Sequence, residues 1–185
     1  MKQTAIALLV LLSSAMSQAQ TKVTFDKFKN TTHFMTEETQ ASKVTLSGGK
    51  DASMLIHHMG MVIGFLCAEQ VKKCEPAGVA LLFVGHTSSW RMHGSNEVSL
   101  LIDGKPASAG KATWNGQVLK GDDLREYNEA TVSPELLDKL AGAKTVDVQI
   151  GVFEFSLTDA NLVAIRDIAS HAGVSVTPVR PGVSP

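Results

Sequence analysis

Two short apolar segments constrain the fold of this chain more than any other feature. Residues 79–84 are apolar at six consecutive positions, and residues 98–102 at four positions of five. Short runs of branched apolar residues between turn residues are typical of strands. Because the first run lacks the alternation of a half-exposed strand, we expect both of its faces to be covered. The sequence therefore predicts two strands of one sheet, with residues 79–84 at the centre of the core.

The C-terminal third carries the clearest pattern in the chain. Residues 146–150 alternate apolar and polar, and residues 153–157 alternate in the opposite parity after Gly151 and Val152. A two-residue connection that begins with glycine predicts a type II′ hairpin. This register places six apolar side chains on one buried face. They are Val146, Val148, Ile150, Phe153, Phe155 and Leu157.

A helix is predicted on each side of this hairpin. Ser133 and Pro134 supply an N-cap and a first helical position, and the first helix ends near Gly142. Thr158 caps a second helix that runs to about Ala172. The predicted fold class is therefore α+β: a β-rich antiparallel sheet or sandwich with a C-terminal helix-hairpin-helix.

Two other regions are harder to interpret. Residues 54–66 fit either a buried helix or a long strand, but Gly60 and Gly64 would each cost a helix about 1 kcal/mol relative to alanine. We therefore predict a strand there, and an edge strand at residues 23–26. Residues 105–130 have the weakest pattern, and little is predicted for them.

The first residues predict where the protein resides. Lys2, an apolar run and the small residues that end at Ala19 form a secretory signal peptide, with cleavage expected after Ala19. The predicted organisation is a signal peptide at 1–19, a single β-rich domain at 20–173 and a flexible C-terminal tail at 174–185. We expect a secreted protein, which would be periplasmic in a Gram-negative bacterium.

Charge and hydropathy argue against nucleic acid as a partner and against a membrane-spanning helix. Without residues 1–19 the chain keeps 16 basic and 18 acidic residues, a balance that does not favour nucleic acid. No later segment reaches the roughly 20 apolar residues of a membrane-spanning helix, so we expect no transmembrane segment. The expected partner is an unidentified protein or small ligand.

The two cysteines, Cys67 and Cys74, predict a disulfide. In an oxidising compartment, two cysteines separated by a polar loop are typical of a structural bond. Six residues lie between them, whereas zinc knuckles and thiol oxidoreductases use a spacing of two. We therefore favour the disulfide over a metal site or a redox pair.

One strand face suggests copper. His57, Met59 and Met61 occupy alternate positions, and imidazole together with thioether ligands suits Cu(I). The competing interpretation, which we favour, is that the methionines fill gaps in the core. The copper site requires both sulfurs to be reachable from solvent.

The loop that follows residues 79–84 suggests a contact surface. His86, Trp90, Arg91 and His93 combine aromatic, basic and polar groups, which suits contact with a ligand or partner. A plain strand connection, with Trp90 packed inward, is the interpretation that we favour.

Catalytic motifs are absent from the sequence. It contains no His-Glu-x-x-His, Gly-x-Ser-x-Gly, phosphate-loop or calcium-loop pattern. The acidic residues Asp122, Asp123 and Glu126 are interpreted as solvated loop charge rather than as a glycosidase pair. We therefore expect a domain without catalytic activity or cofactor that binds a partner or ligand. The alternatives are a copper-binding envelope protein and an enzyme whose site is assembled from distant loops.

Overall fold

The computed structural model of the protein describes residues 20–94, 96–121 and 123–174. The predicted signal peptide and the predicted tail beyond residue 174 lie outside these residues. About half of the described residues belong to one antiparallel sheet of 12 strands, and this confirms the predicted β-rich antiparallel character. Eleven of the strands follow the order β1 (Thr21–Asp26), β2 (Thr31–Thr36), β6 (His58–Ala68), β7 (Val79–Thr87), β10 (Leu124–Val132), β9 (Lys105–Val118), β8 (Asn96–Ile102), β11 (Val146–Ile150), β12 (Phe153–Ser156), β4 (Thr45–Leu46) and β5 (Lys50–Asp51). The twelfth, β3 (Thr39–Gln40), pairs with β6 outside this order.

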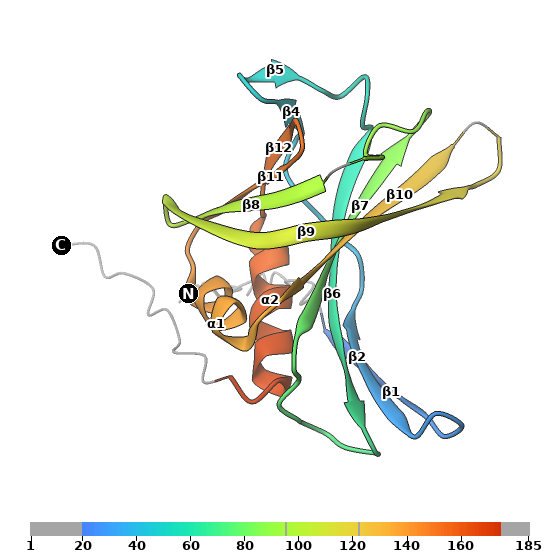
Figure 1. Ribbon diagram of the computed structural model, residues 1–185, viewed down its shortest axis with the longest axis vertical. Helices are drawn as coiled ribbons and strands as arrows, with labels where there is room; N and C mark the ends of the chain where they lie inside the picture. The colour runs from blue at the N-terminus through green and yellow to red at the C-terminus, as the bar shows by residue number, and fades with distance from the viewer. Residues whose placement is uncertain (1–19, 95, 122, 175–185) are drawn as a thin grey trace, which may run out of the picture.

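The sheet curls around helix α2 (Asp159–His171), and the shorter helix α1 (Pro134–Gly142) lies beside α2 (Figure 1). The inner face, meaning the side of the sheet turned toward α2, carries the core. Phe34 of β2 packs there against Phe65 of β6 and against His171 of α2. None of the described helices is long and apolar enough to cross a membrane.

Strand β9 joins the two halves of the sheet, which are the strands from β1 to β10 in the order above and the strands from β8 to β5. Residues 113–118 pair with β10, whereas residues 105–112 pair with β8. Near the end of the stretch that pairs with β8, Gly110 has a φ of 79°, and the pairing with β8 shifts register between Val98 and Ser99. Glycine adopts such a backbone conformation without a steric cost. The bend therefore lets one strand pair with β10 and then with β8.

The segment with the weakest sequence pattern thus forms long strands, β9 and most of β10. Pro106 cannot donate to a β ladder, and it lies in the part of β9 that, among the described strands, pairs only with β8. The two apolar runs belong to one sheet as predicted, although β10 and β9 separate β7 from β8. Strand β7 lies between β6 and β10, and its Val79, Leu81 and Phe83 are fully buried.

The hairpin register predicted from the sequence is confirmed. Ile150 pairs with Phe153 and Val148 with Phe155, and all six predicted inward side chains are buried. Gly151 has a φ of 58°, which a turn of this kind requires at its first position. Phe155 meets Phe83 of β7 edge to face with ring centroids 5.6 Å apart, so the hairpin packs across the core against the other half of the sheet.

Side-chain caps fix where the helices begin. The Ser133 hydroxyl accepts a hydrogen bond from the Leu136 N–H at the start of α1. Thr158 and Asn161 form a capping box at the start of α2. The Asn161 amide also donates to the side-chain oxygen of Thr39 at 2.7 Å. Thr39 lies in the short strand β3 (Thr39–Gln40), which pairs with β6, so this cap attaches α2 to the sheet.

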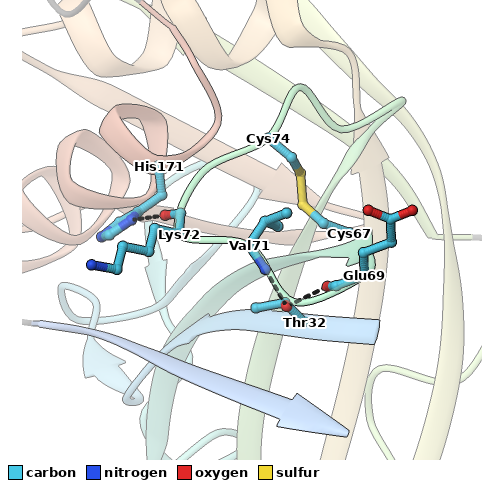
Figure 2. The surroundings of a disulfide bond; sticks show 7 residues. All are labelled: Thr32, Cys67, Glu69, Val71, Lys72, Cys74 and His171. Atoms are coloured by element: carbon cyan, nitrogen blue, oxygen red, sulfur yellow. Dashed lines mark hydrogen bonds between the residues drawn. A yellow bond between two sulfur atoms is a disulfide. The ribbon is translucent and has the colours of Figure 1, made fainter. Parts of the chain in front are cut away.

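The predicted disulfide joins Cys67, near the end of β6, to Cys74 in the following loop (Figure 2). The Thr32 hydroxyl donates to the Glu69 carbonyl at 2.7 Å and accepts from the Val71 N–H, which attaches this loop to β2. The Cys74 N–H in turn donates to the carbonyl of His171, at the end of α2. The loop therefore connects the sheet to the C-terminal end of the helix.

We expect the Cys67→Ser, Cys74→Ser double variant to lose about 2.5 kcal/mol of unfolding free energy, because the bond removes loop-closure entropy from the unfolded chain. Urea denaturation measures this difference. Reductant should destabilise the wild-type protein by the same amount and leave the double variant unchanged. Equal stability of the oxidised wild type and the double variant would contradict the prediction.

Candidate functional site

The residues of the copper hypothesis are separated by burial. Met59 and Met61 are 2% and 0% exposed on the inner face of β6, whereas His57 is exposed and precedes the strand. The thioether sulfurs therefore lie in the core with Ile63 and Phe83, and the solvent access that the copper site requires is missing. The structure corresponds to the favoured interpretation of these methionines as core residues.

The loop residues singled out for contact divide between the two faces of the sheet. Trp90 and His93 each meet Trp114 of β9 edge to face, with ring centroids 5.6 and 4.6 Å away. Gly116 lies under the two indoles, because a Cβ at that position would collide with both rings. Trp90 stays 43% exposed, so a partner contact through this loop remains a prediction. His86 belongs to β7 and points to the outer face.

Glu126 corrects the interpretation of the acidic residues as solvated loop charge. Its side chain is fully buried on the inner face of β10. One carboxylate oxygen accepts from the Thr87 hydroxyl and the Arg91 N–H, and the other accepts from the Met92 N–H and the Trp114 indole N–H, at 2.7 to 3.2 Å. A buried carboxylate needs such donors to offset the loss of hydration. Glu126 therefore ties the loop around residues 90–93 to Trp114 of β9.

A second cluster lies on the outer face of the sheet, which is the side turned away from α2. His58 of β6 and His86 of β7 are direct cross-strand neighbours, and their imidazole rings are 5.1 Å apart. Both Nε2 atoms approach the same oxygen of Glu38, at 3.3 Å from His58 and 3.2 Å from His86. All three side chains are partly exposed, between 25% and 32%. We call Glu38, His58 and His86 the outer cluster.

A bulge between β2 and β3 brings Glu38 to the histidines. The ladder with β6 stops at the Met35–Gly64 pair and resumes at the Thr39–Met61 pair, so residues 36–38 lie opposite residues 62–63. The Thr36 hydroxyl fills part of this gap, because it accepts a hydrogen bond from the Ile63 N–H at 3.1 Å. Such an extra residue bends the strand and redirects a side chain.

Gly60 makes room for the redirected carboxylate. It is two residues from His58 and therefore on the same face of β6. A Cβ at Gly60 would overlap the Glu38 carboxyl group. The absence of a side chain at this position thus allows Glu38 to lie flat over β6 and face both imidazoles.

Arg125 completes the surroundings of Glu38. It lies in β10 directly opposite His86, so His58, His86 and Arg125 form a row across three neighbouring strands. Its Nη2 atom is 3.5 Å from Glu38 Oε2, whereas both histidines face Oε1. The positive charge therefore orients the carboxylate and leaves one oxygen directed at the imidazole pair.

The outer cluster has the composition and spacing of a metal site. Its three ligand atoms all lie within 4.8 Å of one another. In a tetrahedral zinc site with bonds of about 2.0–2.1 Å, ligand atoms are separated by about 3.3 Å, which agrees with the two distances from Glu38 Oε1. Two imidazoles and one carboxylate suit zinc and related divalent ions.

Two surface grooves lie elsewhere. One, of about 630 Å³, is lined by residues of β8, β11 and β12 that include Ser99, Asp147 and Glu154. The other, of about 720 Å³, is formed by the β1–β2 hairpin and includes Phe28 and Met35. Neither groove contains residues of the 86–93 loop or of the outer cluster.

Sequence patterns did not reveal the outer cluster. Its members lie on two strands and on the bulge, and they meet only because of strand register. Comparison with models of known families, with curated proteins and with solved structures found no match to this chain.

For Glu126 we expect the Glu126→Gln variant to lose about 2–3 kcal/mol of unfolding free energy. In the variant, the side-chain NH₂ of the glutamine replaces one carboxylate oxygen and therefore faces donors that it cannot accept from. The lost hydrogen bonds are to a charged group, and such bonds contribute about 1.5–3 kcal/mol. Denaturation followed by tryptophan fluorescence measures the loss and reports on Trp114. Glu129→Gln, at an exposed position of the same strand, is the matched control. Similar stabilities of the two variants would count against the anchoring role.

Proposed function

We propose that this protein is a secreted or periplasmic metal-binding protein without catalytic activity. Its β-rich domain, residues 20–173, binds one divalent transition metal ion of the zinc type through His58, His86 and Glu38. The observation that carries the proposal is the convergence of two imidazole Nε2 atoms on one carboxylate oxygen, at 3.2 and 3.3 Å. The Cys67–Cys74 disulfide is consistent with an oxidising compartment.

The protein holds these ligands in place before any metal arrives. His58 and His86 are fixed by the β6–β7 register, and Glu38 is fixed by the bulge and by Arg125. The paired strands therefore bear most of the entropic cost of assembling the site. Because protons compete with the metal for imidazole nitrogens, we expect affinity to decrease as pH is lowered.

The donor set favours a zinc-type ion over Cu(I) and calcium. Imidazole nitrogen and carboxylate oxygen are ordinary zinc ligands, whereas Cu(I) prefers the thioethers that are buried here. A calcium ion would require six to eight oxygen ligands. Three protein ligands leave a fourth position open, as in zinc sites that accept water or an exogenous ligand.

The first test is calorimetric titration of untagged protein, residues 20–185, with Zn²⁺. We expect one equivalent to bind to the wild type, and His86→Ala to weaken binding by at least about 100-fold, because loss of an outer-shell partner alone costs 10–100-fold. His57→Ala removes an exposed neighbouring imidazole that is outside the cluster, and it should bind like the wild type. No binding by the wild type, or equal losses in both variants, would contradict the proposal.

A second test moves Glu38 without changing any ligand. In Gly60→Ala the added methyl group should displace the Glu38 carboxyl group from its position over β6, so Zn²⁺ affinity should decrease by about tenfold or more. The fold should tolerate the change, which circular dichroism and thermal unfolding of the metal-free protein will show. Gly142→Ala, at a helical position where a Cβ meets nothing within 4 Å, is the matched control. Unchanged zinc affinity in Gly60→Ala would show that Glu38 is not a ligand.

A further inference from the structure

We infer that the outer cluster also binds a small oxyanion, a carboxylate or a phosphate, which bridges the bound metal ion and the guanidinium of Arg125. This inference rests on the proposed metal site and adds the class of its exogenous ligand. It derives from the position of Arg125, from its unused hydrogen-bonding capacity and from the charge balance of the site.

Position is the first argument. His58, His86 and Arg125 occupy facing positions on β6, β7 and β10, and neighbouring positions of this kind are about 5 Å apart. Glu38 spans the row, with Oε1 toward the histidines and Oε2 toward Arg125. A metal ion between the imidazoles therefore has the guanidinium as its neighbour along the sheet.

The unused donors of Arg125 are the second argument. A guanidinium carries five N–H donors, yet in the described structure its single ion-pair contact is the 3.5 Å approach to Glu38, longer than the about 2.7–2.9 Å of a strong charge-assisted bond. Its Nε atom is enclosed and has no hydrogen-bond partner among the described residues. About a third of the side chain is exposed, so a ligand from solvent can reach it.

Charge balance is the third argument. A divalent ion, one carboxylate and one guanidinium leave a net charge of +2, and among the described residues Glu38 is the only acid in ion-pair contact with the two histidines or Arg125. An anion at the open fourth position lowers this charge, whereas a neutral ligand does not. Carboxylates and phosphates are also the groups whose paired oxygens fit the planar fork of arginine.

The geometry assigns distinct roles to the two cations. One oxygen of the anion completes the coordination of the metal, and a second oxygen accepts hydrogen bonds from the Nη atoms of Arg125. Because a lysine offers a single point charge, Arg125→Lys should keep the charge but lose the forked contact. Arg125→Gln should lose both the charge and the fork.

The test uses Co²⁺ in place of Zn²⁺, because its visible absorption reports both binding and coordination. Untagged protein, residues 20–185, is loaded with Co²⁺ and titrated in separate arms with acetate and with inorganic phosphate, at an ionic strength fixed with perchlorate. We expect a saturable spectral change in the wild type. The anion that binds with the higher affinity, acetate or phosphate, identifies the kind of oxyanion. Anion affinity should decrease by about tenfold or more in Arg125→Gln and by less in Arg125→Lys.

Arg91→Gln removes a different exposed arginine and serves as the control, for which we expect wild-type anion affinity. If Co²⁺ binds but neither anion changes the spectrum, or if both Arg125 variants bind the anion like the wild type, the bridging role is wrong and the metal site stands. If the wild type does not bind Co²⁺, the metal site fails and the anion site fails with it. Circular dichroism establishes that each variant is folded, and Arg125→Lys provides the comparison if Arg125→Gln does not fold.

Discussion

The architecture depends on one strand that changes partner along its length. Strand β9 pairs first with β8 and then with β10, so the two halves of the sheet are continuous and curl around α2 (Figure 1). This curvature brings Phe155 of the second half against Phe83 of the first. Without the bend near Gly110, the apolar face of each half would lack the other half as its cover.

Burial of the inner face also determines what the outer face can present. Because side chains alternate along a strand, fixing Met59 and Met61 in the core commits His58 to the opposite side. The same alternation places Thr87 and Glu126 inside and His86 and Arg125 outside. The core therefore sets the register of the outer cluster, and a slip of one residue between β6 and β7 would separate the two imidazoles.

Glu126 and Glu38 show how one residue type serves two purposes. Glu126 is enclosed and accepts four hydrogen bonds from described protein donors, so it ties the loop that carries Trp90 to Trp114 of β9. Glu38 is partly exposed, and one of its oxygens faces two imidazole nitrogens that protons or a metal ion can occupy. The first arrangement stabilises the fold, and the second is open to an exogenous ion.

Features encoded by residues close together in the chain were predictable from the sequence: the hairpin around Gly151, whose parity change requires one buried face, the β-rich antiparallel character, and the disulfide between Cys67 and Cys74. The long strands within residues 105–132 were not, because neighbours on β7 and β8 stabilise them more than their own periodicity does. The outer cluster was decided only by the tertiary structure. Glu38, His58 and His86 lie far apart in the chain, and a bulge and a strand register, both set by burial of the opposite face, bring them together.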